Sequence, residues 1–217
     1  ARARSESLQD VPATITAFTE SQIENMGVER AEDFIFMTPG VTMVNTVEIG
    51  DTSLSIRGLN GARDAETNFA FIVDGILYPN PYGFNREMPD LAQIEVLKGP
   101  QGALYGRSAA AGAVIMSTKK PSDESDMRVK FSVAEHGTNS ALFTVAGALG
   151  ETVAGRFTVA HRSTDGHLEN VYQNNANVVN DYDEINVSAR LLFEPTDRLS
   201  IDTKLSVGSA EGAPIAF

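Results

Sequence analysis

The sequence predicts an α+β domain followed by a series of antiparallel β-strands. Short helix and strand signals are interspersed over residues 1–121. After an acidic linker at residues 122–126, apolar and polar side chains alternate with a period of two over residues 127–217. Hydrophobic residues make up 42% of the chain, which is enough for a packed core. We therefore expect two regions, 1–121 and 127–217, with different folds.

Two short helices are expected near the start of the first region. Thr19 and Gln22 have the spacing of a capping box, and Gly27 provides a stop. A second helix is expected over Arg30–Met37, and Thr38-Pro39-Gly40 would end it.

Several short strands follow in the first region. They are predicted at Val41–Asn45, Ser53–Arg57, Phe69–Val73, Ile94–Lys98 and Val114–Thr118. Asp74-Gly75 stands between two apolar runs, which is a strong hairpin signal because both residues tolerate positive φ.

The second region contains five alternating segments, each about as long as a tilted strand that crosses a bilayer. In the first, Val129 and Phe131 alternate with Lys130 and Ser132. Such alternation suits a membrane barrel, with lipid outside and a polar lumen inside, and it equally suits a soluble sandwich. Short turns combined with a long polar connection at Thr164–Asp181 are typical of outer-membrane barrels.

Five strands are too few to close a barrel around a folded domain, since plugged transporters use about 22 strands. We therefore expect an incomplete barrel whose last strand is an edge.

Composition excludes several classes of protein. A formal net charge of -12 argues against a nucleic-acid binder, which needs a basic face. The absence of cysteine excludes disulfides and thiolate metal sites. The sequence contains no apolar run of about 20 residues, and Ala1-Arg2-Ala3-Arg4 does not resemble a signal peptide.

Other candidate sites are weaker. His136, His161 and His167 are scattered, so a surface or lumen position is expected rather than metal ligation. The acidic run 181–184 is expected to be a solvated cluster, with Ca²⁺ binding as the alternative. Gly106-Arg107-Ser108 is similar to the end of a phosphate-binding loop, but Arg107 stands where that loop needs lysine. With no nucleophile–base pair to argue from, we do not expect an enzyme.

A series of motifs in the first region resembles one family. In order, they are Ser7–Pro12 with Ile15–Phe18, Pro39-Gly40-Val41, Ser55–Gly58, Val73–Ile76, Ile94–Arg107, Ala110–Ile115 and Thr118–Pro121. Together they resemble the plug domain of TonB-dependent receptors, in the right order over residues 5–121. The run Glu-Val-Leu-Lys-Gly-Pro-Gln-Gly-Ala-Leu-Tyr-Gly is highly specific.

The resemblance implies an α+β plug domain at 1–121 and the start of an antiparallel transmembrane β-barrel at 127–217. The positions that match the plug motif are Gly58, Asp74, Gly75, Glu95, Gly99, Pro100, Gly102, Tyr105, Gly106 and Gly112.

The resemblance also implies that basic residues at two motif positions form an ionic lock with acidic residues of the barrel wall. Here those positions are Arg57 and Lys98. Lysine cannot make the bidentate fork of arginine, so a lock through Lys98 would be looser. The alternative is that both are ordinary charges at strand ends.

Ligand contacts in this family come from plug loops, which correspond here to Leu59–Asn68 and Tyr78–Arg86. Aromatic rings and arginine suit a polar, partly flat ligand. The ligand-contact candidates are Asn60, Arg63, Tyr78, Tyr82, Phe84 and Arg86. Packing against the barrel wall is the alternative role of these loops.

The implied function is TonB-dependent transport of a scarce or large substrate across the bacterial outer membrane. A ferric siderophore is the expected substrate, with oligosaccharide, cobalamin or a soluble β-rich binding function as alternatives. The expected partners are TonB, through a segment upstream of Ala1, together with the substrate and outer-membrane lipid. No cofactor, resident metal or nucleic acid is expected, because iron would enter only as part of a transported chelate.

Overall fold

The computed structural model describes residues 14–45, 52–60, 68–78, 84, 86–105, 109–166, 168–170, 175–179 and 181–212. The chain divides into two compact units, Ala1–Thr118 and Lys119–Phe217. The domain boundary expected from the sequence, after residue 121, falls just beyond this division.

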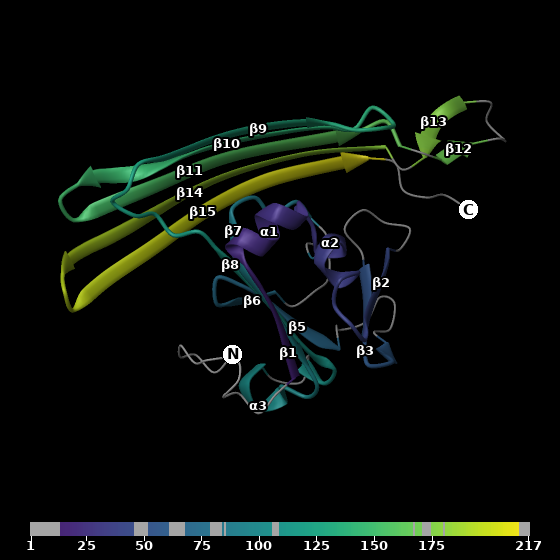
Figure 1. Cartoon of the computed structure of the whole chain (residues 1–217), viewed down its shortest axis with the longest axis horizontal. Coiled ribbons are helices and arrows are strands. Elements are labelled where there is room, and N and C mark those ends of the chain that lie inside the picture. Colours follow the sequence, from purple (N-terminus) through teal and green to yellow (C-terminus); the bar gives the residue numbers. More distant parts are fainter. Residues whose placement is uncertain are drawn as a thin grey trace. The chain divides into compact units, whose positions relative to one another are not determined.

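The N-terminal unit is built on a five-stranded sheet with the order β1-β7-β8-β5-β6 (Figure 1). Its strands are β1 (Thr14–Thr19), β5 (Phe69–Val73), β6 (Ile76–Tyr78), β7 (Leu91–Lys98) and β8 (Gly112–Thr118). The β5–β8 pair is parallel, and the other pairs are antiparallel. The central strands read as continuous apolar runs because both of their faces are covered.

The Asp74-Gly75 hairpin predicted from the sequence is confirmed. Val73 pairs with Ile76, so the turn between β5 and β6 contains only these two residues. Their φ angles of 50° and 82° are the positive values that a type I′ turn requires. Asp and Gly tolerate this conformation better than most residues, which is why the dipeptide predicts the turn.

The helices are α1 (Glu20–Met26), α2 (Ala31–Ile35) and α3 (Gly102–Tyr105). The side chain of Gln22 accepts a 3.0 Å hydrogen bond from the backbone N–H of Thr19, as expected for a capping box. Helix α2 is shorter than the predicted Arg30–Met37. Asp33 Oδ2 accepts the N–H groups of Glu29 and Arg30, each at 2.8 Å, which places the helix start at Ala31.

A separate three-stranded sheet contains β2 (Val41–Asn45), β3 (Thr52–Ile56) and β4 (Leu59–Asn60), in that order. The predicted strand Ser53–Arg57 ends one residue early because Arg57 has a φ of 52°, which is incompatible with an extended chain.

Alternation along the five-stranded sheet divides the buried side chains of the N-terminal unit into two clusters. Phe69 and Phe71 of β5 belong to a large cluster that includes residues of α1 and α2. Ala70 and Ile72, one residue along, belong to a smaller cluster with Ala109 and partly buried Tyr105. Both faces of the central sheet are therefore packed.

The C-terminal unit contains an antiparallel sheet with the order β15-β14-β11-β10-β9 (Figure 1). Its strands are β9 (Asp126–Val133), β10 (Asn139–Gly150), β11 (Val153–Thr164), β14 (Tyr182–Thr196) and β15 (Leu199–Gly212). These correspond to the five alternating segments, and four of them are 12–15 residues long, longer than the predicted crossing length. Within the described residues, β9 and β15 are the two edges of the sheet.

The connection between β11 and β14 was predicted to be a long loop. The structure places a small hairpin there, made of β12 (Leu168–Asn170) and β13 (Asn175–Val179).

Among the residues that the structure describes, no helix has both the length and the apolar character needed to cross a membrane.

Candidate functional site

The two predicted lock residues, Arg57 and Lys98, both contact the turn that precedes β2. Lys98 Nζ donates a 3.0 Å hydrogen bond to the carbonyl of Pro39. The backbone N–H of Arg57 donates to the carbonyl of Gly40 at 2.8 Å. Three motifs that are far apart in the sequence therefore meet at Pro39-Gly40.

The Arg57 side chain lies against Gly99, which follows Lys98 in the chain. A Cβ atom placed on Gly99 would lie 3.5 Å from Arg57 Nη1, so the guanidinium packs against the Gly99 backbone. Lys98 has three N–H donors, and the bond to Pro39 uses one of them. Arg57 and Lys98 therefore lie close together in the plug, and their pairing with the barrel wall stays a prediction.

Gly112 shows why the motif requires glycine at this position. Gly112 pairs with Lys98 where β8 begins, and a Cβ atom there would lie 2.2 Å from the Leu97 carbonyl oxygen. Any side chain would collide with the backbone of β7. Gly99 donates its N–H to Ala111 at 2.9 Å, which holds the Gly99-Pro100 segment next to the start of β8.

The remaining glycines of the motif have other places in the structure. Gly58 follows Arg57 in the β3–β4 turn, Gly102 begins α3, and Gly106 lies outside the described residues.

Asp74 fastens the β5–β6 turn to the end of β8. Its Oδ1 accepts the backbone N–H of Thr118 at 2.8 Å, and its Oδ2 accepts the Thr118 hydroxyl at 2.8 Å. The Asp74 N–H donates in turn to the carbonyl of Met116 at 3.0 Å. We call the Asp74–Thr118 contact the clasp. A carboxylate that accepts two bonds is a strong fastening, since charged acceptors make shorter and stronger hydrogen bonds.

Glu95 of the motif acts electrostatically on Tyr105. Burial, with a smaller contribution from the Glu95 carboxylate, raises the pKa of the Tyr105 phenol above its ordinary value. Glu95 Oε1 also accepts a 2.9 Å hydrogen bond from Gln93 Nε2.

One ligand-contact candidate is wrong. Phe84 is fully buried, and its ring makes edge contacts with Phe69 and Phe71 at centroid distances of 5.1 and 5.0 Å. It is an aromatic core residue, because a ring in a loop can turn inward where the sheet offers an apolar cluster.

Of the other ligand-contact candidates, the structure describes the side chains of Tyr78 and Arg86. Tyr78 is exposed at the end of β6, with its ring centroid 5.4 Å from that of Phe71, and Arg86 is exposed. Asn60 ends β4, and its side chain is outside the described set. Arg63 and Tyr82 lie outside the described residues.

The long sheet of the C-terminal unit carries an apolar band on one face. Cross-strand pairing places apolar residues of all five strands in two adjacent rows, one with Val129, Phe143, Val159, Val187 and Val207, the other with Met127, Val145, Phe157, Ala189 and Leu205. Phe131, at the next row, is 77% exposed, and Leu205 is 68% exposed. A soluble core would bury such side chains, so their exposure favours a lipid-facing barrel wall over a soluble sandwich.

The opposite face of the sheet is polar. One row across all five strands contains Asp126, Ala146, Arg156, Arg190 and Lys204. Polar residues on one face and an exposed apolar band on the other are the arrangement of a transmembrane barrel wall.

The band ends in polar residues beyond Phe131. His161 lies in the same row as Phe131, and its Nε2 is 3.1 Å from Oδ2 of Asp183 in the row beyond. Glu184 is buried and adjacent in sequence to exposed Asp183, so the two carboxylates point to opposite faces. The run 181–184 therefore does not converge on an ion, and the described residues contain no group of three metal-ligating side chains. His136 lies in the β9–β10 turn, and His167 is outside the described residues.

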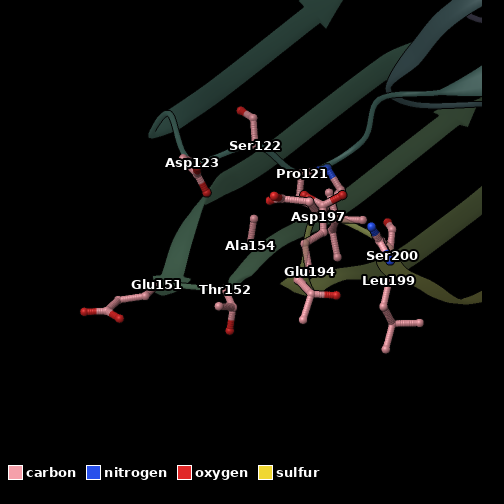
Figure 2. A pocket seen from close by; sticks show the side chains of 13 residues that line it. Pro121, Ser122, Asp123, Glu151, Thr152, Ala154, Glu194, Asp197, Leu199 and Ser200 are labelled. Carbon is pink, nitrogen blue, oxygen red and sulfur yellow. The ribbon is translucent and has the colours of Figure 1, made fainter.

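A pocket of about 670 Å³ lies at the end of the sheet where the short turns are found (Figure 2). Its walls come from residues 121–123, the β10–β11 turn and the β14–β15 turn. Asp123, Glu151, Glu194 and Asp197 make it acidic, with Arg198 as a cation in the lining.

These features are those of a membrane β-barrel wall preceded by an N-terminal α+β domain. Residues 7–113 match the family model of the TonB-dependent receptor plug domain. The chain belongs to the TonB-dependent receptors and carries their plug domain followed by strands of barrel type.

Similarity to individual proteins agrees with this assignment. The catecholate siderophore receptor Fiu of Escherichia coli K12 is 28% identical over 155 residues, 71% of this chain and 20% of that protein. The ferrioxamine receptor of Yersinia enterocolitica is 29% identical over 156 residues, 70% of this chain and 22% of that protein. The chain therefore spans about a fifth of the length of these relatives.

A solved structure shares the fold. The ferric yersiniabactin uptake receptor FyuA of Yersinia pestis superposes with a TM-score of 0.85 at 20% identity. The match covers 91% of this chain and 32% of that receptor.

Sequence reasoning missed Arg190 and its partner Asp202. Alternation places both on the polar face, but only the strand register brings them into contact.

Proposed function

We propose that the receptor containing this chain takes up a ferric siderophore across the bacterial outer membrane, driven by TonB. The plug-domain match carries the proposal, because this domain occurs in receptors named for their dependence on TonB. The substrate class follows from two relatives whose names specify catecholate siderophores and ferrioxamine. Both names denote iron-chelating ligands.

The exposed apolar band supports the location in the outer membrane. Charged side chains are absent from the two central rows of the band, which is the condition for contact with hydrocarbon. The partners of the receptor are then outer-membrane lipid, the chelate and TonB. TonB would grip a segment upstream of the plug by strand addition, in which backbone hydrogen bonds supply the affinity.

Arg57 and Lys98 are proposed as the plug's half of an ionic lock with the barrel wall. The support is that Lys98 Nζ binds the Pro39 carbonyl while the Arg57 guanidinium lies against Gly99, the residue after Lys98. Breaking one side of a buried ion pair typically costs ~3–5 kcal/mol. Arg57→Ala should therefore loosen the plug more than Arg57→Lys, as measured by hydrogen exchange of the β3 amides.

The proposed ligand contacts are Tyr78 and Arg86, with Asn60, Arg63 and Tyr82 kept from the sequence prediction. Exposure of Tyr78 and Arg86 supports them, because a ligand-binding side chain must reach solvent. In this mechanism the receptor needs no cofactor and no resident metal, since iron is part of the cargo.

A growth and uptake experiment tests the function. A strain lacking its own siderophore receptors is given the full-length receptor, and uptake is measured with ⁵⁵Fe-loaded catecholate chelate, ⁵⁵Fe-ferrioxamine, labelled cobalamin and labelled maltooligosaccharide. We expect uptake of an iron chelate that disappears when TonB is deleted. Uptake of cobalamin or oligosaccharide alone would overturn the substrate class, and uptake independent of TonB would overturn the mechanism.

A further inference from the structure

The boundary between the two units lies between Thr118 and Lys119, and each of these residues is hydrogen-bonded within its own unit. Thr118 is the last residue of the N-terminal unit, and the clasp to Asp74 holds it there. Lys119 is the first residue of the C-terminal unit. We call residues 119–126, which lead from this point into β9, the strap.

One end of the strap is held by an arginine–aspartate pair of the sheet. Arg190 of β14 binds Asp202 of β15 through two hydrogen bonds, Nε–Oδ1 and Nη2–Oδ2, both 2.7 Å long. The third nitrogen, Nη1, donates to the Lys119 carbonyl at 3.4 Å, and Lys120 Nζ lies 3.6 Å from Asp202 Oδ2. The Arg190 side chain is only 9% exposed, so this fork is shielded from water and rigid.

The other end of the strap is held by a second pair. Arg156 Nη1 of β11 lies 3.4 Å from Oδ2 of Asp126, the last strap residue, and the Arg156 side chain is 7% exposed. Ser125 packs on β10, since a Cβ atom placed on Gly147 would lie 3.3 Å from Ser125 Oγ. The strap thus crosses the sheet from β14 and β15 to β10 and β9.

The two pairs depend on each other through the register. Arg156 and Arg190 stand directly opposite each other on β11 and β14, where like charges repel. Asp126 and Asp202 supply one carboxylate to each arginine. Because Asp126 belongs to the strap, the strap itself helps to neutralise the arginine row, which favours a strap that stays in place.

We propose that the strap is a fixed tether, with Arg190, Asp202 and Arg156 as positioning residues that hold residues 119–126 on the sheet of the C-terminal unit. The proposal rests on the proposed function, in which TonB pulls on the plug from its N-terminal side. The clasp holds Thr118, the last plug residue that such a pull reaches. The pull then stops at Lys119, so remodelling of the plug ends at Thr118 and the strap does not move.

Single-molecule pulling of the full-length receptor tests this tether without any substrate. The receptor is embedded in lipid, and its N-terminus is pulled by an atomic force probe. We expect a force peak when the chain is extended as far as Thr118, and a separate peak when the strap is released. Release of eight residues adds about 26–29 Å of contour length. In Arg190→Ala and Asp202→Ala the second peak should fall or vanish.

Three variants serve as controls for the force record. Lys130→Ala removes an exposed cation of β9 that pairs in register with Leu142, away from the strap, and should leave both peaks unchanged. The charge swap Arg190→Asp with Asp202→Arg keeps a pair within the sheet but removes the donor to the Lys119 carbonyl and puts a cation beside Lys120, so the second peak should stay low. Arg190→Lys keeps the charge and loses the fork, so its peak should lie between those of the wild type and Arg190→Ala.

A spin label provides an independent measurement on a variant that leaves the pairs intact. The chain contains no cysteine, so Ser122→Cys gives a single label within it. We expect a restrained nitroxide spectrum at Ser122 and faster motion when Arg190→Lys is added. A wild-type force record that runs to Asp126 without a second peak would overturn the tether, as would a Ser122 label equally mobile with and without Arg190→Lys. The uptake assay can succeed or fail independently of either result.

Discussion

The two units of the chain use the same apolar residue types in opposite ways. In the plug domain, Phe71 and Phe84 are buried against each other at the centre of the main cluster. In the barrel-type sheet, Phe131 and Leu205 are largely exposed on one face. The plug hides apolar surface from water, whereas the sheet leaves it exposed on one face. Hydrophobic content therefore does not define a core unless the strand faces are known.

The difference follows from what covers each sheet. The central strands of the plug sheet have clusters on both faces, so Phe69–Val73 reads as an unbroken apolar run. The strands of the long sheet alternate, because one face carries the polar row and the other the apolar band.

Truncating one phenylalanine in each unit should give the largest difference in stability loss between the two units. Phe84→Ala removes a fully buried ring and should cost about 3–5 kcal/mol of plug stability through the cavity it leaves. The matched change Phe131→Ala removes an exposed ring and should leave the plug unchanged. Hydrogen exchange of the β5 amides in the receptor measures both. Equal effects would show that Phe84 is not a core residue.

A charge placed on either face of β15 tests the apolar band. Leu205→Arg should cost about 2–4 kcal/mol of folding free energy in lipid vesicles, because the guanidinium would enter the hydrocarbon. Ser206→Arg, on the adjacent and opposite-facing position, serves as the control and should cost much less. If both variants fold into vesicles equally well, the band does not contact lipid.

The clasp tests how the plug's last strand is held. Asp74→Ala removes both bonds to Thr118 and should cost roughly 1.5–3 kcal/mol, as expected for hydrogen bonds to a charged group. Thr118→Val removes only the hydroxyl bond and should cost roughly half as much. Exchange protection of the β8 amides measures the loss. Asp74→Asn is the control, because asparagine also tolerates the positive φ at this position. If Asp74→Asn loses as much stability as Asp74→Ala, the clasp depends on the charge of the carboxylate.

The smallest expected effect is the pH dependence of Tyr105. Its pKa in the folded plug is raised above 10.0, so the folded state holds the phenol proton more tightly than the unfolded chain does. The resulting stabilisation of the folded plug is present below pH 10.0, the ordinary pKa of tyrosine, and it is lost as the pH rises through the folded-state pKa. The difference in tyrosinate absorbance between the wild type and Tyr105→Phe should titrate above pH 10.0. A midpoint at or below that value would contradict the burial of this phenol.

Sequence reasoning was most accurate where a local conformation decides the structure. The Asp74-Gly75 turn, the Thr19–Gln22 cap and the five alternating strands are each encoded by residues that are close in the chain. It failed at Phe84, where a loop position suggested a ligand contact. Whether a ring in a loop turns inward depends on Phe69 and Phe71, which belong to another segment.

By itself, the sequence determined the family, the order of the two units and the existence of an apolar and a polar face on the long strands. These properties follow from motif order and from a side-chain period of two, both of which are readable along one chain. Only the tertiary structure decided which residues meet across the sheets. Arg190 reaches Asp202 and Asp74 reaches Thr118 through strand register, and register depends on pairing between distant segments that no local pattern specifies.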